Sequence, residues 1–286
     1  VLTAAVGQNS ARQAAVQAGI PVEKTAYVIN QVCGSGLRSI AAAYQSILSR
    51  DSSIVVAGGQ ESMSNAPHAI NIHKGKKLEE KNLIDTMVHD GLWDAFNGYH
   101  MGTTAENVAD KWKISREDQE EFALKSHLKA IRAYSDGNFS NELVSITSNG
   151  NEVCQDDCIR PDSTLESMSN LKPAFMKGGS VTAATSSPLT DGVVFSLICS
   201  EEFAISHSLR PIAAIVSGAV TGCHPELMGL GPISSTNLAL ERAGWEVSDI
   251  DVFELNEAFS SQSIACIREL GLNPETLKNE RNAQPK

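Results

Sequence analysis

The sequence predicts an α/β protein, because helical and strand-like patterns alternate along its 286 residues. Apolar residues make up 42% of the chain and charged residues 20%, a composition typical of a folded globular core. A chain of this length predicts about two domains. We expect a mostly parallel sheet, since the predicted helices fall between the predicted strands.

The first 60 residues contain a strand, a helix and a second strand. Residues 26–30 are predicted as a short strand. Residues 36–49 are predicted as a helix, because apolar side chains recur there at helical spacing. Residues 54–59 form a continuous apolar, largely β-branched run, which predicts a strand covered on both faces.

A more polar region, from about residue 64 to 187, is predicted as an insertion between strands of a central sheet. It contains one clear helix. Ser115 is the expected N-cap, and Glu117 and Asp118 occupy the first turn, where acidic side chains are favoured. Asp136 and Gly137 are expected to end this helix.

The last third returns to alternating elements. Residues 211–220 and 252–255 are predicted as strands, and residues 237–243 and 259–270 as helices. Segments 27–40 and 253–267 both run from a strand through an Asn-led polar turn into a helix. This faint repeat is compatible with a duplicated fold.

Charge and cysteine content exclude several classes of function. The net charge of −11 argues against non-specific nucleic-acid binding. No apolar run is long enough for a membrane span. The six cysteines lack the partner spacing of a metal site, and they do not suggest a disulfide scaffold. We expect a reduced protein that is intracellular, in the cytoplasm, without a metal site.

Cys33 is the first candidate for chemistry. It lies between a predicted strand and a helix start, where free backbone N–H groups and the helix dipole favour a thiolate. Gly34 and Gly36 would let a substrate approach the backbone closely. The alternative is a small buried cysteine without function.

Three further segments carry polar groups at places where sites form. Asn256 follows a predicted strand and could hold a water or an oxyanion, or simply cap a helix. Segment 179–188 is rich in small hydroxyl residues that could hydrogen-bond a ligand, or could be an ordinary loop. His100 lies between glycines and could equally be structural.

Together these segments resemble the thiolase family. The run Asn-Gln-Val-Cys-Gly-Ser-Gly at 30–36 is similar to its nucleophile motif. Five more motifs occur in family order, namely Val-Val-Ala-Gly-Gly-Gln-Glu-Ser-Met-Ser (55–64), Gly-Tyr-His-Met-Gly-Thr-Thr-Ala-Glu-Asn (98–107), Leu-Lys-Pro-Ala-Phe (171–175), Met-Gly-Leu-Gly-Pro (228–232) and Asn-Glu-Ala-Phe (256–259). The similarity runs from Gly7 to about Pro274 and is greatest to biosynthetic, acetoacetyl-CoA-type thiolases.

The resemblance implies an acyltransferase that condenses two acetyl-CoA molecules to acetoacetyl-CoA and CoA, or runs the reverse thiolysis. Cys33 would carry the acetyl group, and Asn256, through a water, would stabilise the enolate. His100 and Met101 would lie near the acyl group. Coenzyme A would be a substrate and product rather than a cofactor. Two further sets of residues are expected to contact the CoA ester. Polar or small side chains would line the CoA tunnel at Arg160, Ser167, Ala183 and Ser187. Apolar side chains would form its walls at Leu92, Phe175 and Phe259.

The resemblance also implies the layered αβαβα thiolase fold, with an incomplete C-terminal half. The expected parts are an N-terminal half-domain at 1–65 plus 189–209, a loop domain at 66–188 and a C-terminal half-domain at 210–286. The family's Gly-His-Pro and Cys-x-Gly-Gly-Gly motifs, which supply the base and the proton-transferring cysteine, do not occur in this sequence. We therefore expect a chain truncated at both ends, whose own activity is uncertain.

Two other functions stay open at this point. One is a truncated thiolase chain that binds CoA esters without turnover or pairs with a full thiolase subunit. The other is a ketoacyl synthase of the same fold, which the Asn-Glu-Ala-Phe motif and the Gly-Tyr-His-Met loop argue against. The family resemblance also implies a homodimer or homotetramer, and a missing start leaves organellar targeting untestable.

Overall fold

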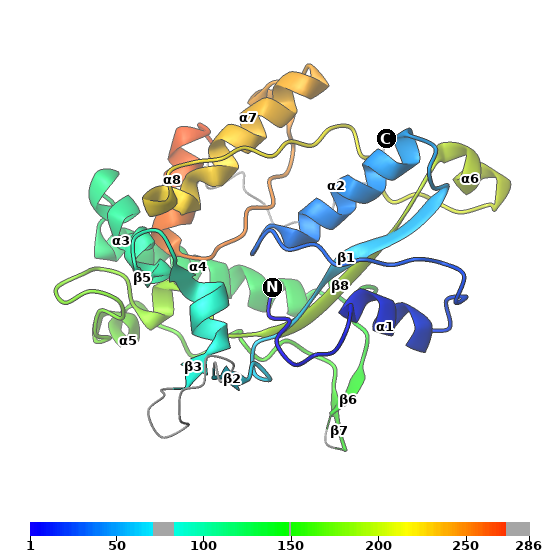
Figure 1. Ribbon diagram of the computed structural model, residues 1–286. Coiled ribbons are helices and arrows are strands. Elements are labelled where there is room, and N and C mark those ends of the chain that lie inside the picture. The colour runs from blue at the N-terminus through cyan, green and yellow to red at the C-terminus, as the bar shows by residue number, and fades with distance from the viewer. Residues whose placement is uncertain (71–82, 149, 273–286) are drawn as a thin grey trace. The chain divides into compact units, whose positions relative to one another are not determined.

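The computed structural model describes residues 1–70, 83–148 and 150–272 (Figure 1). The chain divides into two compact units. The first comprises Val1–Trp93 and Leu189–Val216, and the second comprises Asp94–Pro188 and Ser217–Lys286. Each unit is therefore built from two separate stretches of sequence. The three-part division expected from the sequence remains a prediction.

The first unit centres on two long paired strands. Strands β1 (Ile54–Ser62) and β8 (Asp191–Cys199) pair antiparallel along their whole length, with Ile54 opposite Cys199. Gly58 is needed for this pairing, because a Cβ there would lie 2.0 Å from the carbonyl oxygen of Val194. The unit also contains α1 (Ser10–Gln17), α2 (Ser35–Leu48), β2 (His68–Ala69), β3 (Ile84–Asp85), a π-helical turn (Met87–Leu92) and α6 (Glu201–Ser206).

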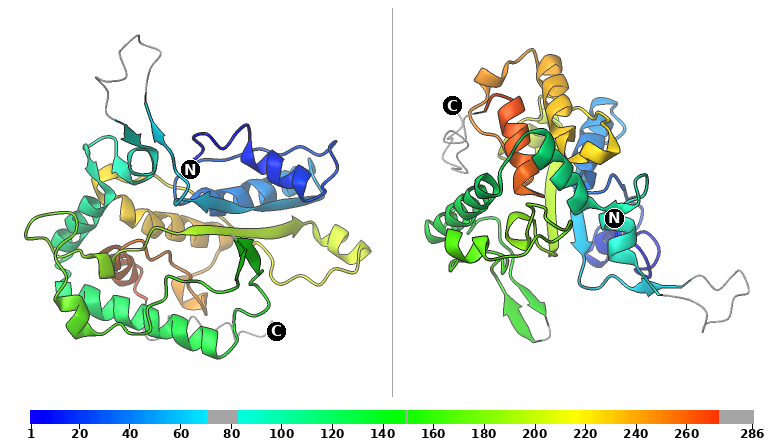
Figure 2. Two further views of the ribbon diagram at one scale, coloured as in Figure 1. Left: turned by 90° about the horizontal axis from the view of Figure 1, so that it is seen from below. Right: turned by 90° about the vertical axis from the view of Figure 1, so that its left-hand side faces the viewer.

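Helix α2 packs along β1 and β8, as Figures 1 and 2 show. The Ser39 hydroxyl donates to the carbonyl oxygen of Gly58 at 2.9 Å. A Cβ added at Gly59 would lie 3.6 Å from the Cα of Gly36, so the first turn of the helix rests closely on the strand. This contact fixes the start of α2, and with it the turn that carries Cys33.

The second unit is mainly helical. Its elements are β5 (Tyr99–His100), α3 (Met101–Lys111), α4 (Arg116–Ser135), β6 (Ile146–Ser148), β7 (Asn151–Val153), α5 (Leu165–Ser169), α7 (Gly231–Ala243) and α8 (Ser260–Glu269), with 3-10 turns at Ala183–Thr185, Pro225–Leu230 and Val247–Asp249. The two-residue strand β4 (Trp93–Asp94) spans the junction of the units.

Helix α8 lies at the centre of the second unit, packed against α3 and α4 (Figure 1). Every residue from Ser260 to Ile267 is buried. One apolar cluster joins Val108, Ile114, Ile264 and Ala265, and a second joins Ala105, Val181 and Phe259. Because these clusters hold α3 and α8 together, the residues at their N-terminal ends are placed rigidly.

Several predicted elements are confirmed. The helices predicted at 36–49, after Ser115 and at 259–270 appear as α2, α4 and α8. Helix α7 begins at Gly231, six residues before the predicted start at 237. The sequence reading missed α1, whose N-cap Asn9 accepts a hydrogen bond from the Arg12 backbone N–H at 3.1 Å.

Three of the predicted strands do not form, and the predicted pairing and coverage of a fourth were wrong. Residues 26–30, 211–220 and 252–255 are not in strands, because no other segment of the described chain forms a backbone ladder with them. The long β1–β8 pair is antiparallel rather than part of a parallel sheet. Residues 54–59 do form a strand, but not one covered on both faces: α2 packs along the pair, and Val56 stays 52% exposed.

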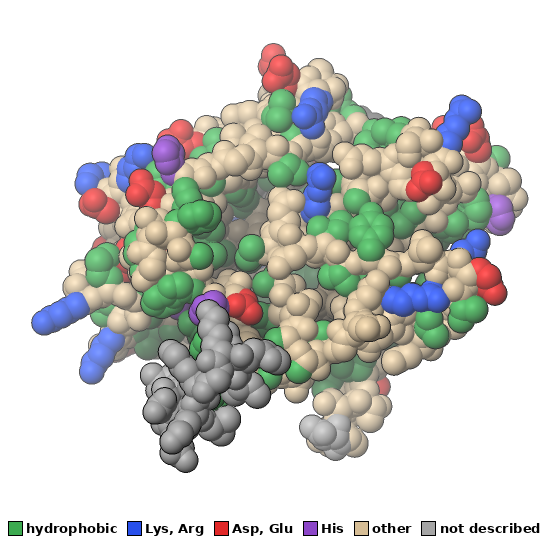
Figure 3. All heavy atoms as spheres, viewed as in Figure 1, with side chains coloured by type: hydrophobic (Ala, Val, Ile, Leu, Met, Phe, Trp, Pro, Cys, Tyr) green, Lys and Arg blue, Asp and Glu red, His purple; other side chains and the backbone are tan. Residues whose placement is uncertain are grey.

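Apolar side chains reach the surface in both units, and Figure 3 shows many of them on one face among the charged groups. Among the described residues, no helix combines the length and apolar character needed to cross a membrane.

Candidate functional site

The turn that carries Cys33 is built by its neighbours. The Ser35 hydroxyl accepts from the Gln31 backbone N–H at 2.8 Å and donates to the carbonyl oxygen of Val32 at 2.6 Å. The Asn30 side chain accepts from the Val32 N–H at 3.0 Å. Gly34 is the N-cap of α2, so Cys33 immediately precedes the helix. Cys33 is an exposed free thiol, and the alternative of a buried cysteine was therefore wrong.

Val32 adopts a left-handed backbone conformation with φ of 49°. This conformation is costly for a β-branched residue, on the order of 1–3 kcal/mol. The Ser35 and Asn30 hydrogen bonds hold Val32 in place against that cost. Such strain is typical of turns that aim a neighbouring side chain outward for chemistry.

Three aromatic rings stack at the start of α3. The His100 ring lies parallel to the Phe175 ring, with centroids 4.8 Å apart, and Phe175 meets Phe259 edge-on at 5.9 Å. Gly102 makes room for this stack, because a Cβ there would lie 2.1 Å from the Phe175 ring. The structure thus brings together three of the predicted contact residues, His100, Phe175 and Phe259.

His100 is also the N-cap of α3. Its Nδ1 accepts a hydrogen bond from the Gly102 backbone N–H at 3.0 Å, which requires that nitrogen to be unprotonated. Burial lowers the pKa of His100 below its ordinary value, so the neutral ring is favoured. Met101 follows as the first residue of α3, and its carbonyl oxygen accepts from the Thr104 hydroxyl at 2.6 Å.

The small-residue segment 182–188 lies beside the 256–259 turn. Ser186 and Phe259 form an antiparallel bridge, and the Ser187 N–H donates to the carbonyl oxygen of Ala258 at 2.9 Å. These two contacts hold the segment against the 256–259 turn. Asn256 is exposed and does not cap α8, whose N-cap is Phe259, so the capping alternative was wrong.

A cleft of about 390 Å³ opens beside this segment. Helix α4, segment 184–188, residues 253–257 and helix α8 line it, so Ala184, Ser187 and Asn256 share one cavity. The Ser126 hydroxyl donates to Glu257 Oε2 at 2.5 Å and ties the 256–257 turn to α4. Of the predicted residues, Asn256 and Ser187 are brought together here.

Burial and neighbouring charges shift the pKa values of two groups near the cleft, Glu254 and His127. Burial, and then repulsion from Glu257, raises the pKa of the Glu254 carboxyl. Burial, and then the Arg160 charge, lowers the pKa of His127, while Glu257 acts in the opposite direction. The Arg160 backbone N–H also points to His127 Nδ1 at 3.4 Å. Arg160 is thereby placed next to α4.

Ser167 lies in the helix α5 capping box. Its hydroxyl accepts from the Thr164 N–H at 3.1 Å, and the Ser167 N–H donates to Thr164 Oγ1 at 3.1 Å. Ala183 begins a 3-10 turn within the small-residue segment.

Cys33 and Leu92 belong to the first unit, and all the other predicted site residues belong to the second. The roles assigned to all of them remain predictions.

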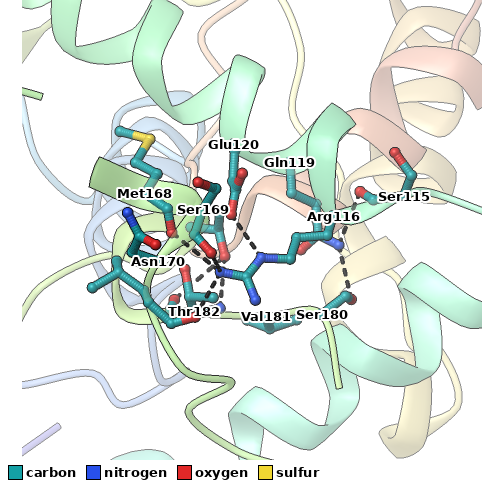
Figure 4. A network of polar contacts seen from close by, with 12 residues as sticks. Ser115, Arg116, Gln119, Glu120, Met168, Ser169, Asn170, Ser180, Val181 and Thr182 are labelled. Carbon is teal, nitrogen blue, oxygen red and sulfur yellow. Dashed lines mark hydrogen bonds and ion pairs between the residues drawn. The ribbon is translucent and has the colours of Figure 1, made fainter. Parts of the chain in front are cut away.

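Arg116 holds the end of α5 in place (Figure 4). Its Nη2 donates to the carbonyl oxygens of Met168, Ser169 and Leu171 at 3.1, 3.1 and 2.6 Å. Its Nε pairs with the buried Glu120 carboxylate at 2.7 Å. This ion pair, in which Glu120 is buried and Arg116 partly exposed, supports the backbone next to Ser167.

The sequence reading missed Glu106, Arg116 and Gln119 as organising residues. All three are charged or amide side chains on faces of α3 and α4 that turn inward, and Glu106 and Gln119 are buried. A polar residue within an otherwise apolar helix face was the available signal.

Within the described ranges, no cluster of three or more His, Cys, Asp or Glu side chains could hold a metal ion.

Comparisons with known proteins point to one family. Residues 1–202 match the family model for the thiolase N-terminal domain, and residues 209–282 match the model for the thiolase C-terminal domain. The chain is 52% identical over 278 residues to an acetyl-CoA acetyltransferase of Paracoccus denitrificans, covering 96% of this chain and 71% of that protein.

Solved structures agree. The chain is similar to the Bacillus anthracis acetyl-CoA acetyltransferase, with a TM-score of 0.89, 40% identity, and coverage of 94% of this chain and 69% of that one. It is also similar to human mitochondrial 3-ketoacyl-CoA thiolase, with a TM-score of 0.88, 37% identity, and coverage of 93% and 69%.

Proposed function

This chain belongs to the thiolase family, and from that premise we propose that it transfers an acetyl group between CoA thioesters through Cys33. The reaction would condense two acetyl-CoA molecules to acetoacetyl-CoA and CoA, or run the reverse thiolysis. The observation that carries the proposal is the exposed Cys33 thiol on a strained turn directly before α2.

In the first half-reaction the Cys33 thiolate attacks the carbonyl carbon of acetyl-CoA. A bond forms between the cysteine sulfur and the acetyl carbon, and the bond from that carbon to the CoA sulfur breaks. CoA leaves as a thiolate and takes up a proton. Acetyl-Cys33 remains as the intermediate.

In the second half-reaction the α-carbon of another acetyl-CoA attacks acetyl-Cys33 and releases the cysteine thiolate. This step needs a base to remove the α-proton and donors to stabilise the enolate oxygen. We assign the enolate role to Asn256, acting through a water. The two family motifs that would supply the base and the second cysteine do not occur in the printed sequence.

The binding roles are assigned residue by residue. His100 and Met101 would lie near the acyl group, and Phe175 and Phe259 would provide an apolar wall, which the observed ring stack supports. We also assign an apolar contact with the ester to Leu92. We assign contacts with the CoA moiety to Arg160, Ser167, Ala183 and Ser187. CoA acts as a substrate or product, and no cofactor is invoked.

The test is acetylation of the protein by acetyl-CoA alone, followed by intact-mass and peptide mass spectrometry. We expect one acetyl group on Cys33, with one CoA thiol released. Cys33→Ser should abolish the acetylation. Cys223→Ser, which removes an exposed cysteine of the other unit, should leave it unchanged.

A second assay measures acetoacetyl-CoA. Acetylation of Cys33 without acetoacetyl-CoA would favour the alternative of a chain that binds CoA esters, or pairs with a full thiolase subunit, without turnover. Failure to acetylate Cys33 would overturn the proposal.

We also infer a homodimer or homotetramer in a reducing, intracellular setting. Exposed apolar side chains on β8, such as Val194 at 74% and Leu197 at 54%, support self-association. Cys33 and Cys223 are exposed free thiols, which supports a reducing setting. Light scattering should give a mass above that of one chain, and Val194→Lys should lower it.

A further inference from the structure

We propose that Glu106 is a positioning residue for CoA-ester recognition, because its buried carboxylate holds the segment 180–187 in its binding conformation. The inference rests on the proposed function only for the identity of the ligand. Glu106 itself contacts neither ligand nor reacting atoms in this proposal. It acts through the backbone of the segment.

The Glu106 carboxylate accepts three hydrogen bonds from two consecutive residues. Oε2 accepts from the Ser180 N–H at 2.9 Å and from the Ser180 hydroxyl at 3.0 Å, and Oε1 accepts from the Val181 N–H at 2.9 Å. The side chain of Glu106 is only 4% exposed. Charge-assisted bonds of this kind are strong when shielded from water.

No Lys, Arg or His of the described chain forms an ion pair with Glu106. The hydrogen-bond donors of the segment therefore compensate its buried carboxylate. Removal of these donors would leave a buried carboxylate unsatisfied, so the segment and the side chain stabilise one another.

Gly179 shows how tightly the two are fitted. A Cβ at this position would lie 2.1 Å from Glu106 Oε1, so only glycine permits the carboxylate to reach the backbone. On the other side, Gln119 Nε2 donates to the Ser180 hydroxyl at 3.0 Å (Figure 4). Ser180 is thus held from both α3 and α4.

The far end of the segment is fixed independently. The Thr182 N–H donates to Thr185 Oγ1 at 2.9 Å, and Ser186 and Ser187 pair with Phe259 and Ala258. Ala183 lies between the Glu106 contacts at one end of the segment and the Phe259 and Ala258 contacts at the other. Ser187 is itself part of the second set of contacts. Both residues are proposed CoA contacts. Loss of the Glu106 anchor would free one end of the stretch that carries them.

Glu106 also links this segment to His100. His100 caps the start of α3 and Glu106 lies in the middle of that helix, which packs on α8. The same helix therefore sets the position of the histidine that stacks on Phe175 and of the segment that carries Ser187. A change at Glu106 should affect binding of the ester more than the intrinsic reactivity of Cys33.

The test compares Glu106→Gln with Ser180→Ala. The glutamine keeps the shape of the side chain but replaces one acceptor with an N–H donor that faces backbone N–H groups. We expect CoA to bind about tenfold more weakly to Glu106→Gln than to the parent protein. The loss of CoA affinity should be smaller in Ser180→Ala, because this variant keeps both backbone hydrogen bonds to Glu106. Binding is measured by titration calorimetry with CoA.

Hydrogen–deuterium exchange of peptides spanning 180–187 provides the second readout. Both variants should exchange faster there than the parent protein. The control is Trp112→Phe, which removes the 2.7 Å hydrogen bond from Trp112 Nε1 to Glu269 at the other end of α3. This control should lower the melting temperature without changing exchange at 180–187 or CoA affinity.

Unchanged exchange at 180–187 in Glu106→Gln would overturn the inference. Faster exchange with unchanged CoA affinity would also overturn it, because the segment would then have no role in recognition. If Glu106→Gln does not fold, Ser180→Ala decides the question on the same two readouts. If the parent protein binds no CoA, the proposed function fails and the recognition role with it, while exchange still decides whether Glu106 anchors the segment.

Discussion

Gly102 and Gly36 illustrate how tertiary contacts give the same residue type different roles. Both lie in the first turn of a helix, α3 and α2 respectively. A Cβ at Gly102 would lie 2.1 Å from the Phe175 ring, whereas a Cβ at Gly36 would meet no described atom within 4 Å. Packing therefore requires glycine at position 102. Packing within the described chain does not require it at position 36, where only a bound ligand or the local turn could do so.

We expect Gly102→Ala to destabilise the protein by about 1–3 kcal/mol, because the added methyl group displaces Phe175 from the ring stack. Gly36→Ala is the matched control and should stabilise α2 by roughly 0.5–1 kcal/mol, because alanine has the higher helix propensity. Urea unfolding measures both free energies. Equal effects of the two substitutions would contradict the assigned role of Gly102.

At the scale of elements, α4 shows that local signals suffice when they are strong. The Ser115 hydroxyl accepts from the Asp118 N–H at 3.0 Å, and Asp118 Oδ2 accepts from the Ser115 N–H at 3.3 Å. This reciprocal pair forms a capping box, and Gly137 follows the helix with a φ of 73°. Both ends of α4 follow from residues within three positions of them.

Ser115→Ala should therefore lower the free energy of unfolding by about 0.5–2 kcal/mol, since one backbone N–H at the helix start loses its partner. Ser135→Ala, at the exposed last position of α4, serves as the control and should change stability by less than about 0.5 kcal/mol. Chemical denaturation followed by circular dichroism measures both. A Ser115→Ala protein as stable as the parent would show that the cap contributes nothing.

The strands behave differently from α4. Residues 211–220 and 252–255 have strand-like sequences, yet they form no ladder within the described chain. A strand depends on a neighbour that supplies the other half of its hydrogen bonds, and that neighbour is distant in sequence. Strand β1 forms because β8, more than 120 residues away, supplies that half, with Ser62 opposite Asp191.

At the scale of the whole molecule, burial couples protonation to folding. Burial lowers the pKa of His100, and burial together with the Arg160 charge lowers that of His127. In the unfolded chain both histidines take up a proton near pH 6.5, whereas the folded state resists this. The unfolded state then binds more protons, so folding stability falls as the pH drops through about 6.5.

We expect the free energy of unfolding to decrease from roughly pH 7 to pH 5. His100→Asn should flatten this decrease, because asparagine does not titrate and still offers an acceptor to the Gly102 N–H at the helix start. His127→Gln should flatten it separately. Denaturant unfolding at several pH values provides the measurement, and an unchanged slope in both variants would contradict the assignment to these histidines.

The sequence by itself determined the family, the α/β class and the helices whose caps and apolar faces are local, as in α2, α4 and α8. It also indicated the Cys33 turn, because a cysteine followed by Gly-Ser-Gly before a helix is a pattern within a few residues. It did not reveal that Val32 is strained there, since the conformation depends on hydrogen bonds from Ser35 and Asn30 that only a folded turn makes.

Only the tertiary structure decided which distant residues meet. The contacts of Glu106 with Ser180 and Val181 join positions 74 and 75 residues apart, and Ser126 meets Glu257 across 131 residues. Propensity and periodicity act over a few residues, so they fix helices and turns. The stack of His100 on Phe175, the strand pairing and the buried carboxylate arise from packing between segments, where the free energy depends on shapes and donors brought together by the fold.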